Sequence, residues 1–522
     1  MTPSEQPQLT AARPAEASLT DGPTVAVVIA SSGARAWLSE CLASLIPQCL
    51  RSNAELVVVR ADTPSAIMEL STAYPYVRFI FAPPRTAVSE LRSAGVAAVA
   101  AAVVTLLDDS DDQAIPGEHW LERISWRAER STSAAGHAGV KRSADPTTLE
   151  AGPTLQPYLS VVVPAYQAAG ILRHSLEAIS RSDLPRASRE LIVVDDASTD
   201  GTALVAAHFA DTVIRLPGTP RGPAYARNRG FEFARGECVA FINADVCVHR
   251  DTLSRFARVL GGEPEVSAVS GSYDTIPAAG GFVSQYRNLL LNYYHQESAG
   301  ASETFWASCG ALRSAAFTDA GMFDEWRFPR RQIEDAELGY QLRKRGHQIV
   351  LRPEIQGTHL RRWTVSEMIA ADLNDRAVPW MRVFPREVTA VSPRRTGRRT
   401  VKNINTALTW IALVTGMTAV LADRPVLGVV AAACIAAVQL HDRHKLRFFA
   451  RERGIWFALS VIPLQALSYL VRGVAIVLGW LLRELVGEPT PAPTVEAYAE
   501  VGVKMWPPVP VKRPRAGPAM SE

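Results

Sequence analysis

Three segments in the middle of the chain place carboxylates where they could do chemistry. Asp195 and Asp196 end the apolar run ELIVV, Asp245 follows the apolar run VAFI after two residues, and Glu334 and Asp335 precede an amphipathic stretch. Such carboxylates can accept hydrogen bonds from a base or ribose, bind a divalent cation through hard oxygen atoms, or remove a proton as a general base. The region is therefore a candidate site for nucleotide, metal and proton-transfer chemistry.

Each carboxylate also has a purely structural interpretation. Asp, Ser and Thr favour turns and helix caps, which would account for the segment DDASTDGT after residue 194 and for Asp245. Glu334 and Asp335 could equally be the first residues of a helix. His359 follows Asp335 by 24 residues and, taken alone, is more often structural than a ligand. No single segment decides between the two interpretations.

The elements around these residues predict an α/β fold. The runs 159–166, 190–196 and 239–246 are short, apolar and rich in β-branched residues, and helical stretches separate them. Strands that alternate with helices form a parallel sheet, and ligands bind beyond the carboxyl ends of its strands. The carboxylates at 195–196 and 245 should share that edge, and a helix starting at 334 would keep its acidic residues ionised.

The same arrangement occurs earlier in the chain. The segments 25–32, 40–46, 55–64 and 87–111 match 159–166, 174–180, 190–202 and 222–246, in that order. This is an internal repeat at a separation of about 135 residues. Arg60 and Ala61 stand in place of Asp195 and Asp196. The first copy is thus interpreted as a truncated, non-catalytic half-domain. This copy keeps an acidic cluster, which comprises Asp108, Asp109, Asp111 and Asp112. The cluster is interpreted either as a solvated loop or as a regulatory nucleotide site.

Composition excludes several classes of protein. Among 522 residues, 55 Lys and Arg nearly balance 52 Asp and Glu, which argues against a dedicated nucleic-acid binder. The hydrophobic fraction of 48% excludes disorder for most of the chain, and 20% charged residues exclude a polytopic transporter. Six cysteines without a CxxC pair argue against a thiolate zinc site and favour a reduced compartment.

Three apolar segments near the C-terminus predict membrane helices at about 404–422, 426–440 and 454–480. Basic runs at 393–402 and 441–453 flank the first two, as expected for a hairpin with both ends in the cytoplasm. Pro463 and Arg472 interrupt the third, so a span, a re-entrant loop and an interfacial helix all remain open. A buried helical hairpin of a soluble domain is the alternative.

These boundaries predict six regions. They are a disordered segment at 1–23, the degenerate half-domain at 24–129, a linker at 130–157, a catalytic domain at 158–390, membrane helices within 403–482 and a disordered tail at 488–522.

The segment 159–385 resembles a family-2 glycosyltransferase with the GT-A fold. Seven pieces occur in the family's order: VVVPAY, VVDDASTDGT, GPAYARNRG, FINAD, GALRSAAFTDAGMFDE, IEDAELGYQLRKRG and HLRRW. The resemblance continues through the apolar C-terminus, as in membrane-attached bacterial members that build cell-surface glycans. It implies inverting sugar transfer from a nucleoside-diphosphate donor, at the bacterial cytoplasmic membrane, with the catalytic domain facing the cytoplasm.

The resemblance also implies roles for particular residues. Asp335 matches the catalytic base and Glu334 its neighbour in the ED motif, whereas Arg362 and Trp363 match a motif near the diphosphate and acceptor. Asp245 and His359 match ligands of a divalent cation, Mg²⁺ or Mn²⁺. The implied donor-binding residues are Pro164, Ala165, Tyr166, Asp195, Asp196, Arg227, Asn243 and Asp245.

One departure from the family concerns the metal. The family's DxD motif reads Asn243-Ala244-Asp245 here, and an amide can hydrogen-bond a ribose but supplies no charge. Metal dependence is therefore less firmly implied than the fold.

The implied partners are a nucleoside-diphosphate sugar, a lipid-linked or other glycan acceptor, the membrane and proteins of glycan assembly, but no nucleic acid. By analogy with such folds, 281–298 helps to form the acceptor site. The degenerate first copy and Asn243 leave a non-catalytic scaffold of a glycan-assembly complex as the alternative. A processive polysaccharide synthase would need more membrane helices than this chain supplies.

Overall fold

The computed structural model describes residues 23–487, except 34, 110–115, 117–119, 123, 126–156, 329, 331 and 384–392. The chain divides into two compact units, Met1–Glu129 and Arg130–Glu522. The predicted disordered segments at 1–23 and 488–522 and the predicted linker at 130–157 lie outside the described residues, apart from positions 23 and 157.

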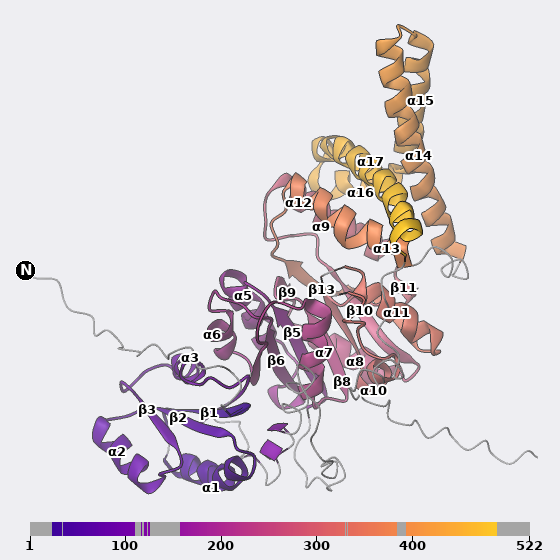
Figure 1. The fold of residues 1–522 in the computed structure, drawn as a ribbon. Helices are drawn as coiled ribbons and strands as arrows, with labels where there is room; N and C mark the ends of the chain where they lie inside the picture. Colours follow the sequence, from indigo (N-terminus) through magenta and orange to yellow (C-terminus); the bar gives the residue numbers. More distant parts are fainter. Residues whose placement is uncertain are drawn as a thin grey trace, which may run out of the picture. The chain divides into compact units, whose positions relative to one another are not determined.

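The first unit contains a parallel sheet with the strand order β3-β2-β1-β4. Its central strand β1 consists of seven buried residues, in keeping with its apolar sequence VAVVIAS. Helices follow the strands in alternation, as predicted (Figure 1). The elements are β1 (Val25–Ser31), α1 (Arg35–Arg51), β2 (Glu55–Ala61), α2 (Pro64–Ala73), β3 (Arg78–Ala82), α3 (Val88–Ala98) and β4 (Val103–Asp108).

The second unit begins with a parallel half-sheet of the same design. Its strand order is β8-β5-β6-β7, which repeats the order β4-β1-β2-β3 of the first unit. The elements are β5 (Leu159–Ala165), α5 (Ala169–Ser180), η2 (Arg186–Ser188), β6 (Arg189–Asp195), α6 (Thr202–Ala207), β7 (Thr212–Arg215), α7 (Pro223–Phe233) and β8 (Cys238–Ile242).

The repeat extends to individual contacts between helix and sheet. A Cβ atom on Gly95 of α3 would lie 2.2 Å from Val28 Cγ1, and one on Gly230 of α7 would lie 2.4 Å from Val162 Cγ1. Both distances are far below van der Waals contact, so each helix approaches its sheet at the same place because glycine has no side chain. The structure thus confirms the internal repeat predicted from the sequence.

The second unit continues into a mixed half-sheet, ordered β11-β13-β10-β12-β8. Strand β12 is antiparallel to both β8 and β10, whereas β10 and β13 are parallel. The predicted α/β fold is therefore confirmed. The elements are β9 (Val246–Val248), α8 (Thr252–Gly262), β10 (Val266–Tyr273), α9 (Phe282–Glu297), β11 (Gly300–Ser302), β12 (Cys309–Arg313), α10 (Ser314–Asp319), α11 (Glu334–Lys344) and β13 (Gln348–His359).

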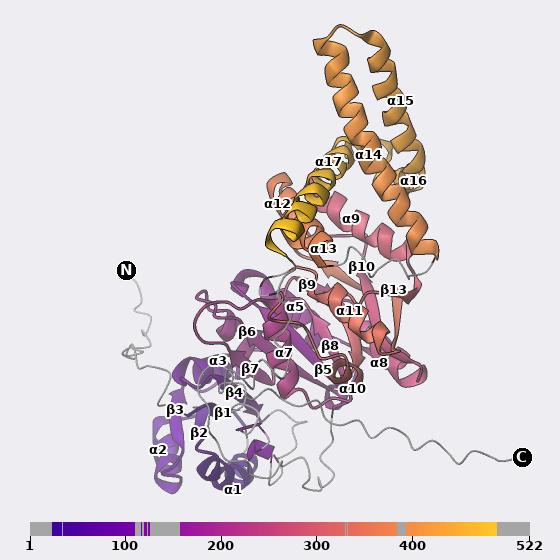
Figure 2. The ribbon, with the colours of Figure 1, turned by 45° about the vertical axis from the view of Figure 1, so that its right-hand side comes forward.

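Helices make up the rest of the described chain. Two segments are long and apolar enough to cross a membrane, 401–421 and 455–486, and a third is counted only if α15 and α16, which meet at 66°, form one span. Helices α14 and α15 lie side by side as a hairpin (Figure 2). The elements are α12 (Val365–Ala370), a π-helix, η3 (Ala371–Ala377), α13 (Val378–Val383), α14 (Pro393–Leu421), α15 (Pro425–His441), α16 (Arg443–Arg453) and α17 (Ile455–Val486).

An apolar cluster joins these helices to the α/β domain. It draws on α9, α12, α16 and α17, and its buried members are Tyr286, Leu289, Met368, Phe449, Ala458 and Val461. Arg453 adds polar contacts, because its guanidinium donates to Gln285 Oε1 at 2.9 Å and to the carbonyl of Thr275. Helix α9 is thus held on one side by the C-terminal helices.

Candidate functional site

Two buried carboxylates stand at the carboxyl end of β6. Asp195 Oδ1 accepts a hydrogen bond from the backbone N–H of Ser198 at 3.1 Å. Asp196 accepts from the backbone N–H groups of Arg221 at 2.9 Å and Gly222 at 2.7 Å. Burial raises the pKa of both carboxyls, although these hydrogen bonds favour the charged forms. Asp196 therefore fixes the turn that leads into α7.

The raised pKa of Asp195 makes stability depend on pH. A group whose pKa is higher in the folded state stabilises the fold at pH below its unfolded value and loses that contribution as the pH rises through the folded value. Asp195→Asn keeps an acceptor for Ser198 but removes the buried charge. We expect the variant to gain thermal stability relative to the parent as the pH rises from 4 to 8, measured by thermal unfolding in detergent. A stability difference that does not change with pH would contradict this account.

Arg227 on α7 brings three of the predicted residues together. Its side chain is 4% exposed, and its guanidinium donates to Glu334 Oε1 at 3.0 Å and to Asn243 Oδ1 at 2.8 Å. Glu334 also accepts from the backbone N–H of Gln332 at 2.9 Å. Glu334 is consequently engaged inside the protein, and Arg227 links the end of β8 to the start of α11.

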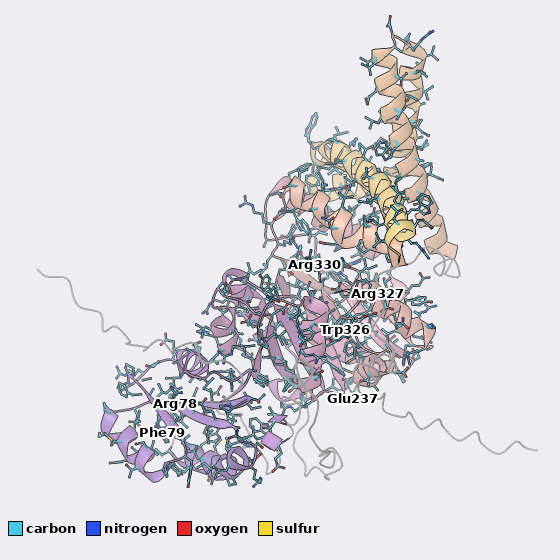
Figure 3. The ribbon with its side chains drawn as sticks, in the orientation of Figure 1. Arg78, Phe79, Glu237, Trp326, Arg327 and Arg330 are labelled. Carbon is cyan, nitrogen blue, oxygen red and sulfur yellow. The ribbon has the colours of Figure 1, made fainter. Side chains whose placement is uncertain are left out.

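Asp335 is more exposed than Glu334. It is the second residue of α11, it is partly exposed, and its Oδ1 accepts from the backbone N–H of Ala336 at 2.8 Å. The helix N-terminus favours its ionised form, which a general base requires. The segment before α11 presents Trp326, 57% exposed, together with Arg327 and Arg330 (Figure 3).

Asp245 and His359 face each other across the pair of strands β9 and β13. Their nearest atoms, Asp245 Oδ2 and His359 Nε2, are 3.5 Å apart, and the backbone N–H of Leu360 donates to the carbonyl of Asp245 at 2.9 Å. The imidazole is buried and stacks on Tyr273, with ring centres 4.2 Å apart and planes inclined by 10°. The sheet therefore fixes the spacing of these two side chains.

This pair fits a divalent cation. His359 Nε2 is buried and makes no hydrogen bond within the described part of the chain. Adjacent ligands of an octahedral cation with bonds of about 2.1 Å are about 3 Å apart, close to the observed separation. Within the described residues no group of three or more His, Cys, Asp or Glu side chains could hold a metal, so two protein ligands are the most this pair provides.

The other predicted residues are spread along the same region. At the end of β5, Pro164 is partly buried, Ala165 is buried and Tyr166 is 51% exposed. Trp363 lies against α9, because its backbone N–H donates to Ser284 Oγ at 2.8 Å and the guanidinium of Arg287 lies over its ring. Arg362 is exposed, and no contact places it beside Asp335.

Sequence reasoning missed two supporting residues. Ser308, next to β12, accepts from Asn243 Nδ2 at 3.0 Å and so orients that amide towards Arg227. Tyr273, the last residue of β10, supports the His359 ring. The segment SGSYD follows an apolar run, as Asp195 and Asp245 also do. This shared pattern is the feature of the sequence that could have indicated Tyr273 as a site residue.

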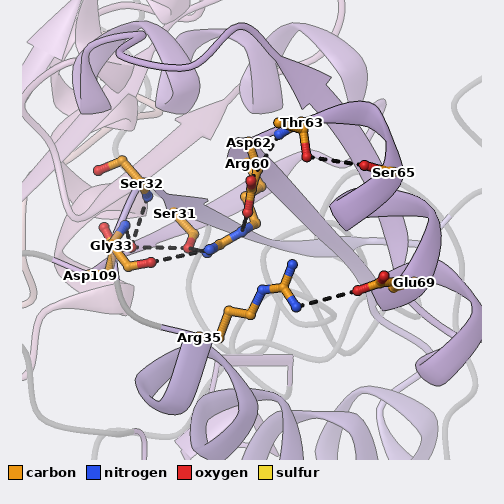
Figure 4. Close-up of polar contacts among 10 residues, drawn as sticks. All are labelled: Ser31, Ser32, Gly33, Arg35, Arg60, Asp62, Thr63, Ser65, Glu69 and Asp109. Carbon is orange, nitrogen blue, oxygen red and sulfur yellow. Dashed lines mark hydrogen bonds and ion pairs between the residues drawn. The ribbon is translucent and has the colours of Figure 1, made fainter.

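The corresponding place in the first unit is filled by its own side chains (Figure 4). Arg60, at the position of Asp195, is buried and donates to Asp62 at 3.0 Å, to Ser31 Oγ at 2.5 Å and to the carbonyl of Gly33 at 3.1 Å. Asp109 accepts from the backbone N–H groups of residues 32 and 33. These contacts engage the polar groups of Arg60 and Asp109 within the first unit. Asp111 and Asp112 of its predicted acidic cluster lie outside the described residues.

One contact of the second unit has a counterpart in the first unit. Arg92 on α3 donates to Asp108 at the end of β4 at 3.3 Å, and both are buried. This contact corresponds to that between Arg227 and Asn243. The same link between a helix and a strand end thus occurs in both units.

Residues 160–322 match the family model of glycosyl transferase family 2. The chain is 25% identical over 209 residues to glycosyltransferase AglE of Haloferax volcanii, covering 39% of this chain and 67% of that protein. It is 32% identical over 98 residues to the poly(ribitol-phosphate) beta-N-acetylglucosaminyltransferase TarS of Staphylococcus aureus, covering 18% and 17%. The matched segment thus spans about two thirds of the first relative but less than a fifth of the second.

A solved structure also resembles this chain. The mannosyltransferase PcManGT from Pyrobaculum calidifontis, in complex with GDP-Man and Mn²⁺, gives a TM-score of 0.40 at 19% sequence identity. The aligned region covers 71% of this chain and 96% of that one.

Proposed function

We propose that this chain, whose residues 160–322 match the family model of glycosyl transferase family 2, transfers a sugar, with inversion, from a nucleoside diphosphate to a hydroxyl of a lipid-linked or cell-surface glycan. The observation that supports this most strongly is the Arg227 link between Asn243 and Glu334. It connects the strand-end residues, which are suited to a nucleotide, to helix α11, whose second residue is Asp335, the proposed base.

The proposed donor site lies along the carboxyl ends of β5, β6 and β8. Asp195 and Asp196 offer acceptors for base or ribose donors, and Tyr166 offers an exposed ring on which a base can stack. Asp245 and His359 would hold the divalent cation, which supplies positive charge against the diphosphate when bound. Only one carboxylate serves that cation, so we expect a modest intrinsic affinity.

The proposed reaction needs one proton transfer. Asp335 takes the proton of the acceptor hydroxyl, and the oxygen attacks the anomeric carbon from the face opposite the diphosphate. The new C–O bond forms as the bond to the diphosphate oxygen breaks, which inverts the configuration. Glu334 does not compete as the base, because its carboxylate is occupied by Arg227 and Gln332.

We also propose that the protein acts at a membrane, with the catalytic domain on the cytoplasmic side. Two helices are apolar and long enough to cross a bilayer, and basic residues are concentrated at 393–402 and 441–453. Tethering raises the local concentration of a lipid-linked acceptor, which favours that acceptor class.

The test is a donor screen on the detergent-solubilised full chain with Mg²⁺ or Mn²⁺. Release of the nucleoside diphosphate from one sugar nucleotide, dependent on Asp335, supports glycosyl transfer. Nucleotide binding without release calls for a panel of polyprenyl-linked and soluble glycan acceptors. Absence of both nucleotide binding and release would favour a scaffold of a glycan-assembly complex.

The metal assignment gives a separate prediction. We expect His359→Gln to weaken Mn²⁺ binding in the presence of UDP or GDP by at least about tenfold, because a ligand is lost. Free Mn²⁺ measured by electron paramagnetic resonance reports this without turnover. His347→Gln is the matched control, since His347 pairs with Asp319 and Ser267 away from this pair. Equal affinities in the two variants would remove His359 from the metal site.

A further inference from the structure

Helix α16 is amphipathic and lies between two apolar helices. One face is buried through Lys445 and Phe449, one turn apart, and Phe449 packs in the cluster that contains Tyr286 of α9. The helix follows α15 at a bend of 66° and is separated from α17 by Gly454 alone. Trp456, near the start of α17, is 79% exposed. An amphipathic helix with these neighbours is suited to the membrane–water boundary.

The other face of α16 carries a row of arginines. Arg443, Arg447 and Arg451 are spaced four residues apart, so they project from the same side of the helix, and all three are exposed. None of their guanidinium groups forms an ion pair or a hydrogen bond with another described residue. The row is therefore a concentrated positive charge that no carboxylate in the described part of the chain pairs with.

A buried polar network lies at the junction of α15 and α16, where the row of arginines begins. Asp442, at the junction of α15 and α16, accepts from Lys445 at 2.9 Å, from the Tyr469 hydroxyl at 2.8 Å and from Asn405 at 3.2 Å. The network joins α14, α16 and α17. The part of α14 that follows Asn405 is apolar, and so is α15. The N-terminal part of α14, which precedes Asn405, is basic and has the sequence PRRTGRRTVK. The network thus separates the apolar hairpin from the basic segments.

We propose that the row of Arg443, Arg447 and Arg451 binds the anionic phospholipid headgroups of the leaflet from which the α14–α15 hairpin enters the bilayer. Arginines near an anionic leaflet are attracted over a Debye length of about 8–10 Å, and a guanidinium matches phosphate oxygens in bidentate geometry. The proposal rests on the proposed membrane insertion. Because the opposite face of α16 packs near α9, headgroup binding would also hold the acceptor-side helix at the membrane surface.

The test compares lipids at the boundary of the full chain reconstituted in phosphatidylcholine vesicles. Spin-labelled phosphatidylglycerol and spin-labelled phosphatidylcholine are added separately, and the motionally restricted fraction is measured by electron paramagnetic resonance. We expect the anionic label to be restricted more than the zwitterionic one at low salt, and the difference to shrink at high salt. Arg443→Gln, Arg447→Gln and Arg451→Gln together should abolish the preference.

A control removes the same charge elsewhere. Arg181→Gln, Arg258→Gln and Lys344→Gln change three exposed cations of the α/β domain, and this variant should keep the preference. Equal restriction of the two labels in the parent, or an undiminished preference in the α16 variant, overturns the proposal. Absence of any restricted lipid overturns membrane insertion and this proposal together, but it leaves donor hydrolysis by the solubilised protein untouched.

Discussion

Replacement of Asp335 by Asn should abolish sugar transfer while donor binding persists. The amide cannot take a proton, and general-base catalysis contributes about 10²–10⁴-fold to rate. Asp335 contacts the backbone at Ala336 and is not part of the Arg227 link, so the substitution leaves the buried contacts of the donor side in place. Turnover is measured as diphosphate release with acceptor present, and donor affinity by titration of the nucleotide in the same preparation.

Asp251→Asn is the matched control for Asp335. Asp251 also precedes a helix, α8, and pairs with Arg255 on the surface, so its loss should leave turnover intact. If Asp335→Asn weakened donor binding as much as turnover, Asp335 would be a binding residue and not the base.

Replacement of Arg227 by Met should be the most damaging single substitution in the α/β domain. It leaves the carboxylate of Glu334 buried without its cation, and breaking one side of a buried pair costs about 3–5 kcal/mol of folding free energy. For a domain of this size that corresponds to a fall in the unfolding temperature on the order of 10 °C. We also expect turnover to be lost, because Asn243 and the start of α11 are no longer linked.

Two further variants test whether the unpaired carboxylate of Glu334 causes the loss of stability in Arg227→Met. Arg255→Met breaks a surface pair with Asp251 at 2.6 Å and should cost about 1 kcal/mol or less. Arg227→Met combined with Glu334→Gln should cost less than the sum of the single substitutions, since the second removes the stranded charge. Equal losses of folding free energy for Arg227→Met and Arg255→Met would show that the buried pair stabilises the protein no more than the surface pair does.

The sequence predicted the sheet and its candidate carboxylates better than their partners. Buried parallel strands have continuous apolar runs, so β5, β6 and β8 could be located, and Asp195 and Asp196 were placed correctly at a strand end. The partner of Arg227 could not be predicted, because Glu334 lies 107 positions away and the contact depends on how α7 and α11 pack. The stacking of Tyr273 on His359 is equally a product of strand order.

In the C-terminal region, apolar runs alone did not predict every helix. The basic stretch 441–453 was predicted only as a flank of the membrane segments, yet it forms the helix α16. Its helical spacing was present in the sequence, but its buried face is meaningful only once α9 and α17 pack against it. Likewise, the third apolar segment extends beyond Pro463 and Arg472 as a single 32-residue helix.

The length of α15 bears on the thickness of the bilayer that suits this protein. With 17 residues at 1.5 Å each, the helix is about 26 Å long, shorter than a hydrocarbon core of about 30 Å. In the proposed membrane-inserted state, the charged pair at the hairpin tip, Asp423 and Arg424, reaches the far headgroups where the bilayer thins locally or where these side chains extend towards the headgroups. Hydrophobic mismatch is thereby built into the hairpin, and bilayers of shorter acyl chains should accommodate it at the lowest cost in membrane deformation.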